Sequence, residues 1–256
     1  MSILLKNCTL ITGTGSDPVP DAWVLVAGGT IERIGNRQAP PPAADTVIDG
    51  ADCTLLPGLI NLHVHIQRRH LSLHSGKGTF KEGAPAVENS SDIRRMLLAV
   101  KNAWRELACG VTTIRDCSSK NRINIALRNA LREGIINGPS VLACGFGIAC
   151  TGGHETHKYQ GAVEADGPDE IRKAVRTEIR AGADFVKFMG SGGIGGMPED
   201  EDPDWVELGE EELAAGIREA HRRGRRTTVH AMGRESILNA LRAGIDCIEH
   251  GCNLDE

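Results

Sequence analysis

After Pro57 the sequence alternates between short apolar runs and longer amphipathic segments, and this pattern restricts the possible folds strongly. The apolar runs predict strands over residues 59–65, 111–117, 140–144, 183–189, 227–231 and 246–250. The amphipathic segments predict helices over residues 92–108, 124–133, 168–181, 210–223 and 235–243. Alternation of strands and helices is typical of parallel βαβ units. Six such strands fit either an open doubly wound sheet or part of a (β/α)₈ barrel.

The ends of the predicted helices support this division. The stretches LACGVTTIRD, IRAGADFVKF and LRAGIDCIEH each close a helix with glycine and then begin an apolar strand. Glycine allows the left-handed cap that lets the chain turn back into a sheet. The first of the helices is expected to be capped by Ser90 or Ser91.

Residues 1–57 have a different pattern, in which short β-prone runs are separated by turn residues. The runs at 3–5, 9–11, 23–26 and 31–34 predict strands, and Gly28-Gly29 between the last two predicts a hairpin. We therefore expect a small β unit over residues 1–57 and a strand–helix domain over residues 58–256.

Charge and cysteine content narrow the class of protein. The formal net charge is −5 and both signs are interspersed, which argues against a nucleic-acid or membrane surface. The sequence contains no run of 18 apolar residues, so no transmembrane helix is predicted, and the N-terminus does not resemble a secretory signal. The eight cysteines contain no CxxC pair, so a reducing, cytoplasmic location is expected. A small-molecule substrate is the expected partner, and a homo-oligomer remains open.

Histidines cluster at the predicted strand ends. His63 and His65 are two residues apart on one strand, so both side chains point to the same side. His230 and His250 end two later strands. The carboxyl ends of strands carry the ligand site in both candidate architectures, and imidazole is the commonest metal ligand. Two partly buried histidines would explain an isolated pair, but four converging on one place favour a metal site.

Lys187 lies inside the apolar run 185–189, where burial of a lone ammonium is costly. One interpretation is a salt bridge to Asp116 or Glu249. The other is that a desolvated amine reacts with carbon dioxide to form a carbamate, which is a carboxylate able to bridge two cations.

Taken together, the stretches LLPGLINLHVHI, GVTTIRD, TGGHE, GADFVKFMGSGG, VHAMGRESI and GIDCIEHG resemble the amidohydrolase superfamily. The resemblance covers essentially the whole chain and is closest to the imidazolonepropionase-like and Xaa-Pro (prolidase-type) dipeptidase branch. It implies a (β/α)₈ TIM-type barrel, with about six strands present, beside a small β-sandwich to which the N-terminal residues contribute.

The resemblance also implies a site with two Zn²⁺ ions. His63 and His65 would hold one metal, carboxylated Lys187 would bridge both, and His230 and His250 would hold the other. His154, in a glycine-rich loop, would contact the substrate. A hydroxide bridging the metals would then hydrolyse an amide or peptide-type C–N bond, with a dipeptide or N-acyl amino acid as the expected substrate class.

The chain departs from the family pattern at its end, because Glu256 follows the sixth strand directly. The family supplies a metal-binding, general-base Asp from an eighth strand, and no residue here matches it. We therefore expect a partial sequence that is poorly active or inactive alone. Two alternatives stay open: a mononuclear ring hydrolase or deaminase, which would need no lysine on the fourth strand, and an inactive scaffold. His70 and His74 are expected in a loop after the first barrel strand.

Overall fold

A computed structural model describes residues 1–68, 91–157, 160–194 and 201–252. The predicted loop with His70 and His74 lies outside these residues. The chain divides into two compact units, Met1–Leu59 and Ile60–Glu256. Among the described residues, no helix combines the length and apolar character needed to cross a membrane.

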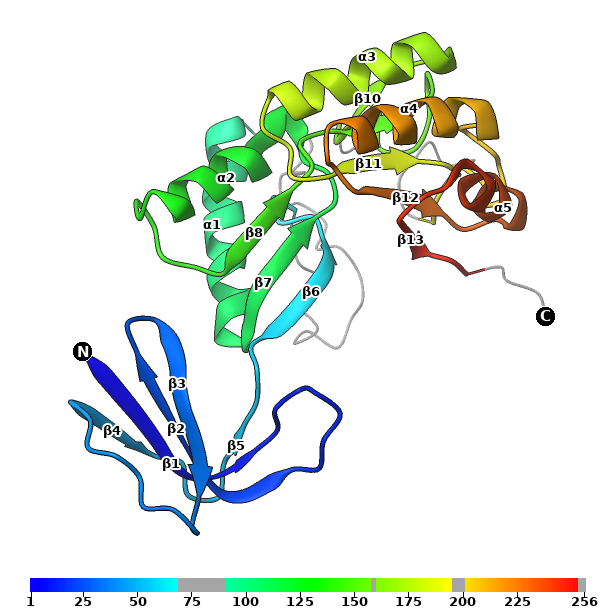
Figure 1. Cartoon of the computed structure of the whole chain (residues 1–256). Coiled ribbons are helices and arrows are strands. Elements are labelled where there is room, and N and C mark those ends of the chain that lie inside the picture. Colours follow the sequence, from blue (N-terminus) through cyan, green and yellow to red (C-terminus); the bar gives the residue numbers. More distant parts are fainter. Residues whose placement is uncertain (69–90, 158–159, 195–200, 253–256) are drawn as a thin grey trace, which may run out of the picture. The chain divides into compact units, whose positions relative to one another are not determined.

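The first unit is a five-stranded β-sheet (Figure 1). Its order is β3-β2-β1-β4, with β5 also paired to β1, and its strands are β1 (Ser2–Leu10), β2 (Val19–Ala27), β3 (Thr30–Asn36), β4 (Thr46–Asp49) and β5 (Thr54–Leu55). The hairpin is confirmed, because β2 and β3 pair antiparallel around Gly28 and Gly29, which have φ angles of 58° and 80°. The two runs predicted at 3–5 and 9–11 belong to one strand whose register shifts beyond Leu5, near Asn7 with its φ of 61°.

The second unit contains two sheets. One has the order β6-β7-β8, formed by β6 (Leu59–Val64), β7 (Val111–Asp116) and β8 (Ser140–Ala143). The other has the order β10-β9-β11-β12-β13, formed by β9 (Gly147–Ala149), β10 (Ala162–Glu164), β11 (Val186–Met189), β12 (Thr227–Ala231) and β13 (Cys247–His250). Strands β11, β12 and β13 are parallel neighbours. The Asp184 amide donates to the Ala143 carbonyl at 2.8 Å, which joins the two sheets.

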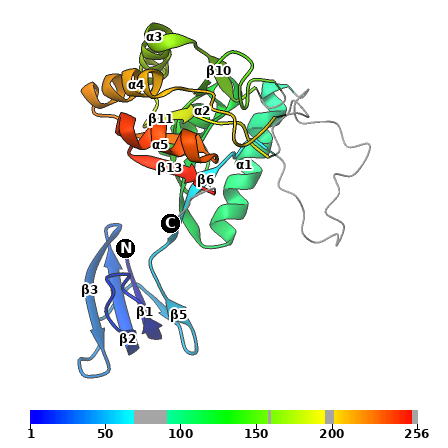
Figure 2. The same cartoon turned by 90° about the vertical axis from the view of Figure 1, so that its right-hand side faces the viewer.

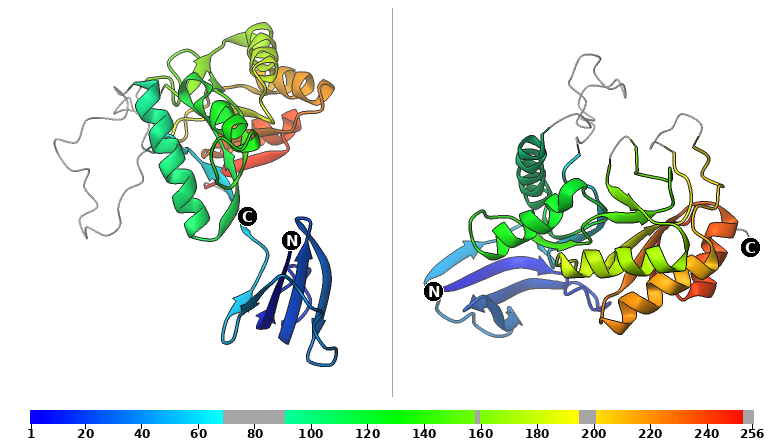
Figure 3. Two further views of the ribbon diagram at one scale, coloured as in Figure 1. Left: turned by 90° about the vertical axis from the view of Figure 1, so that its left-hand side faces the viewer. Right: turned by 90° about the horizontal axis from the view of Figure 1, so that it is seen from above.

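In the described part of the chain, five α-helices cover these strands: α1 (Asp92–Ala108), α2 (Ile123–Arg132), α3 (Gly167–Arg180), α4 (Glu210–Arg222) and α5 (Arg234–Ala243). They lie outside the strands, from α1 beside β7 to α5 beside β12 (Figures 2 and 3). Ser91 is the N-cap of α1, and its hydroxyl accepts the Arg94 amide at 3.3 Å. The α/β fold of alternating strands and helices is therefore confirmed, with each predicted helix displaced by one residue at most.

The third predicted barrel strand, residues 140–144, is present as β8, but the structure adds a strand after it. This added strand is β9, and Gly145 between β8 and β9 has a φ of 77°. A residue in this left-handed conformation interrupts a strand. The short strand β10, which extends the sheet beyond β9, has no counterpart in the prediction.

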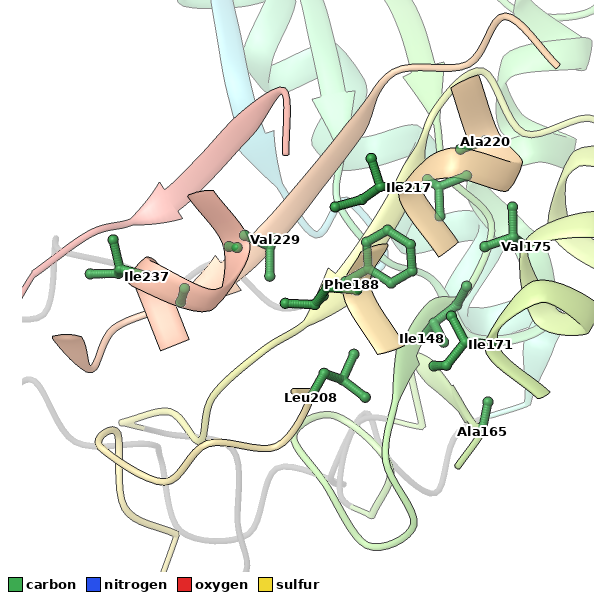
Figure 4. Close-up of a cluster of buried hydrophobic side chains, with 14 residues drawn as sticks. Ile148, Ala165, Ile171, Val175, Phe188, Leu208, Ile217, Ala220, Val229 and Ile237 are labelled. Carbon is green, nitrogen blue, oxygen red and sulfur yellow. The ribbon is translucent and has the colours of Figure 1, made fainter. Parts of the chain in front are cut away.

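The core behind β11 and β12 fixes the position of both strands. Phe188 and Val229 are fully buried and pack with Ile171 of α3 and Ile217 of α4 (Figure 4). Alternation along a strand then sends Lys187 of β11 to the opposite side from Phe188. Packing of the outer face thus determines which side chains reach the interior of the strand array.

Candidate metal centre

All six predicted site residues line one cavity of about 390 Å³. His63 lies in β6 and His65 directly after it, His154 lies in the loop after β9, and Lys187, His230 and His250 lie in β11, β12 and β13. The cavity lies where these strands end, as expected for a barrel of this class. Residues separated by almost 190 positions in the sequence are therefore brought together.

His63 and His65 present their Nε2 atoms to the same point. These two nitrogens are 3.3 Å apart. Two imidazole nitrogens that share a tetrahedral Zn²⁺ at 2.0–2.1 Å are separated by about 3.3–3.4 Å. The pair therefore has the spacing of two ligands to one cation.

Each of these imidazoles is held through its other nitrogen. The Nδ1 of His63 lies 2.7 Å from a carboxylate oxygen of Glu249, and the Nδ1 of His65 lies 3.3 Å from the Ser118 carbonyl. Metal-binding histidines commonly donate their second N–H to a carboxylate or carbonyl, which fixes tautomer and ring orientation. With Nδ1 protonated, the Nε2 lone pair of both rings faces the cavity.

His230 and His250 form the second half of the cluster. Their ring centroids are 4.5 Å apart, and those of His63 and His250 are 4.9 Å apart. The Nε2 of His230 lies 2.9 Å from the Gly192 carbonyl, to which it can donate. This contact leaves the Nδ1 lone pair of His230 for a cation.

His250 reaches the cavity by an unusual backbone conformation. Its φ is 73°, which lies in the left-handed region that residues other than glycine rarely adopt. Alternation would send Glu249 and His250 to opposite sides of β13. The left-handed residue breaks this alternation, so Glu249 contacts His63 while His250 lines the same cavity.

The Lys187 side chain lines the cavity although the residue is only 1% exposed. Within the described residues, its ammonium forms no hydrogen bond or ion pair, so neither predicted salt bridge is present. The Asp116 carboxylate instead accepts from the Ile66 amide at 2.7 Å and the Asn124 side chain at 2.8 Å. Glu249 is paired with His63 and Arg115. The amine is thus buried and accessible from the cavity, as carbamate formation requires.

Burial favours the neutral form of His65, His154, His230 and His250. It lowers the pKa of His65 well below its usual range, those of His154 and His250 to about 4, and that of His230 to about 2. A neutral imidazole is the form that binds a metal. These rings therefore need not lose a proton to accept a cation at pH 7.

His154 is fixed at the cavity wall by three contacts. Its ring stacks on His230, with centroids 4.2 Å apart, and its Nδ1 contacts the Glu201 carboxylate. Its main-chain amide donates to the Glu207 carboxylate at 2.8 Å. Gly193 leaves room for the ring, because a Cβ there would lie 2.4 Å from the imidazole Cε1.

Three side chains around the cavity were not anticipated. Arg68 and Glu155 both line it and form an ion pair, and Glu249 was considered only as a partner for Lys187. Strand alternation would have placed Glu249 on the opposite side of β13 from His250, so the left-handed backbone at His250 is what explains its position beside the site. Nothing in the sequence links Arg68 to Glu155.

His63, Cys117 and Glu249 place ligand-type atoms within 4.8 Å of one another. We do not interpret them as a separate metal site. The 2.7 Å contact between His63 and Glu249 is a hydrogen bond, whereas a nitrogen and an oxygen sharing a tetrahedral Zn²⁺ would be about 3.4 Å apart. Burial also raises the pKa of the Cys117 thiol to about 12, so the thiolate that binds metals is scarce at pH 7.

Comparison with known proteins identifies the family of the chain. The sequence model of the amidohydrolase family matches residues 54–256. The chain belongs to this family. The amidohydrolase described here is 29% identical to ochratoxinase from Aspergillus niger over 271 aligned residues, which cover 96% of the chain and 54% of ochratoxinase.

Solved structures support the fold of this amidohydrolase. A Xaa-Pro dipeptidase with methionine bound in its active site superimposes with a TM-score of 0.86 at 30% identity, over 98% of this chain and 62% of the dipeptidase.

A 66-residue stretch, 25% of the chain, is 41% identical to a 5′-deoxyadenosine deaminase from Methanococcus maripaludis and covers 14% of that enzyme. The chain thus spans little more than half the length of its full-length relatives.

Proposed function

We propose that this amidohydrolase contributes the metal-binding part of a hydrolase that cleaves amide or peptide-type C–N bonds in small molecules. The observation that carries the proposal is the convergence of four imidazoles and one buried amine on a single cavity. Divalent cations bound there would lower the pKa of water and polarise a carbonyl, which is the chemistry that amide hydrolysis needs.

The chain's own residues would hold two Zn²⁺ ions in two groups. His63 and His65 would bind one cation through Nε2, since both Nδ1 atoms are engaged elsewhere. His230 and His250 would bind the other. Lys187, as a carbamate, would contribute a carboxylate to both; its amine is not committed to any described residue, which supports this role.

His154 would orient the substrate. Its ring lies against His230 and at the cavity wall, so a carbonyl bound near the second cation would lie within reach of it. The relation to a Xaa-Pro dipeptidase supports a dipeptide or N-acyl amino acid as substrate. All eight cysteines are free, which supports the reducing, cytosolic compartment proposed for the enzyme.

Metal counting on the purified 256-residue chain tests the proposal. We expect about two Zn²⁺ per chain after reconstitution with Zn²⁺ and bicarbonate, because the ligands form two groups around one bridging position. Hydrolysis of a panel of dipeptides and N-acyl amino acids, followed through the released amine, tests the reaction. A chain that binds no divalent cation would contradict the assignment. Because these 256 residues alone are expected to be poorly active, the inactive-scaffold alternative would be supported by a loaded protein of the relatives' full length that shows no turnover.

A mononuclear deaminase is the second candidate, favoured by the local likeness to 5′-deoxyadenosine deaminase. The two candidates differ at Lys187, which only the binuclear site needs. Under our proposal Lys187→Ala reduces the bound Zn²⁺, and bicarbonate no longer affects the stoichiometry. One Zn²⁺ per chain, unchanged in Lys187→Ala, would favour the deaminase.

A further inference from the structure

The carboxylate of Glu249 connects four strands beneath the candidate metal centre. One oxygen accepts the Nδ1–H of His63 on β6 at 2.7 Å. The other accepts the hydroxyl of Thr228 on β12 and pairs with the guanidinium of Arg115 on β7. Glu249 itself belongs to β13 and is 6% exposed.

This contact crosses the interior of the strand array. β6 is at the edge of one sheet and β13 is at the edge of the other, so they are not neighbours in either sheet (Figure 1). Arg115 strengthens the connection, because its Nε also donates to the Leu62 carbonyl at 2.6 Å, next to His63. The carboxylate is therefore held from both sides and cannot turn away from the imidazole.

From this geometry we propose that Glu249 is a positioning residue, which holds His63 in the Nδ1–H tautomer and aims its Nε2 at the cation. The inference rests on the proposed metal site. His63, Arg115, Thr228 and the Cys247 thiol all contact this carboxylate. An ionised carboxylate can only accept hydrogen bonds, so the Nδ1 of His63 must carry the proton. The orientation of His63 on β6 consequently depends on Glu249 of β13. The next residue of β13, His250, would itself bind the second cation.

Glu249→Gln is the informative variant. A glutamine has the same shape but only one acceptor oxygen, so its NH₂ group must face either His63 or the Arg115 and Thr228 side. The first arrangement favours the wrong His63 tautomer, and the second loosens the side chain. Loss of such an outer partner typically weakens metal affinity by about 10- to 100-fold.

Co²⁺ affinity, measured by competition with a chromophoric chelator, gives the first readout. Of the two Co²⁺ ions, we expect the more tightly bound one to bind about 10- to 100-fold more weakly in Glu249→Gln. The control variant Thr228→Val removes one hydrogen-bond donor to Glu249 but leaves His63 untouched, so its Co²⁺ affinity should fall less than threefold. In a His63→Ala background, Glu249→Gln should have no further effect, because coupling vanishes when the partner is absent. Glu249→Asp, which keeps the charge but withdraws it from His63, replaces Glu249→Gln if that variant does not fold.

A long-range ¹H–¹⁵N spectrum of the metal-free chain gives a readout that needs no cation. His63 should be protonated on Nδ1 in the wild type and should lose this preference in Glu249→Gln. Unchanged Co²⁺ affinity in Glu249→Gln, or an equal loss in the His63→Ala background, would overturn the inference. If the wild type binds no Co²⁺ but shows the expected tautomer, the metal proposal fails while the hydrogen-bond geometry stands.

Discussion

Gly216 of α4 provides a sharp test of how tightly the core positions β11. A Cβ at this residue would lie 2.6 Å from the Phe188 Cζ, 2.7 Å from its Cε1 and 2.8 Å from the Ile171 Cγ2. Ordinary carbon contacts are about 3.5–4.0 Å, so the new methyl is too close to three atoms by about 1 Å. Phe188 and Ile171 are both 0% exposed, which leaves the ring no open space to enter.

Two effects of Gly216→Ala oppose each other. Alanine in a helix interior is favoured over glycine by about 1 kcal/mol. Inserting a methyl into a packed core costs about 1–3 kcal/mol, and three simultaneous overlaps indicate the upper end of that range. We therefore expect a net loss of about 2 kcal/mol in the free energy of unfolding.

Urea denaturation followed by circular dichroism measures this difference. Ala214→Gly in the same helix is the control for helix propensity and should cost about 1 kcal/mol. The double variant Gly216→Ala/Phe188→Leu should regain part of the loss, because the smaller side chain leaves space for the methyl. A Gly216→Ala chain more stable than the wild type would refute the packing argument and indicate that the Phe188 ring moves without cost.

Three further predictions concern the site and the free energy of unfolding at acid pH. Lys187→Met should stabilise the metal-free chain against urea, because a buried ammonium without a partner is costly; a lower free energy of unfolding than wild type would contradict this. Gly193→Ala should move the His154 ring, since a Cβ would lie 2.4 Å from it, and a crystal structure with the stacking on His230 intact would show otherwise. Burial alone would raise the pKa of Asp246, but hydrogen bonds from His221 and an arginine outweigh it and lower the pKa. The stability that this carboxylate contributes is present above pH about 4 and lost as the pH falls further, so Asp246→Asn should flatten urea-measured stability between pH 5 and 2, and equal slopes in both chains would count against it.

The parts of the fold that the sequence predicts are those governed by local periodicity. Helix positions, the Gly28-Gly29 hairpin and the location of four histidines at strand ends all follow from patterns within about ten residues. The added strand β9 does not, because Gly145 before it could equally well end a strand or lie within a longer one.

Contacts between distant segments could not be predicted. The bond between His63 and Glu249 joins residues 186 positions apart, and sequence alone gives no distance between them. Asp116 shows the same limit: near the end of a predicted strand it looked available for Lys187, but the Ile66 amide and Asn124 occupy its oxygens. The sequence indicates which side chains are able to interact with one another. Which of these contacts form depends on the tertiary packing.

The left-handed backbone at His250 has a consequence for how this region tolerates sequence change. A strand ordinarily offers every second side chain to one side, so its interior and exterior positions can vary independently. Here a single φ angle of 73° lets Glu249 contact His63 while the next side chain, His250, lines the cavity that His63 also lines. In a saturation library, most substitutions of His250 should therefore disturb the contact between Glu249 and His63 as well as remove the His250 imidazole. Glycine accepts this φ angle without strain, so His250→Gly should remove the imidazole but leave the Glu249 contact in place.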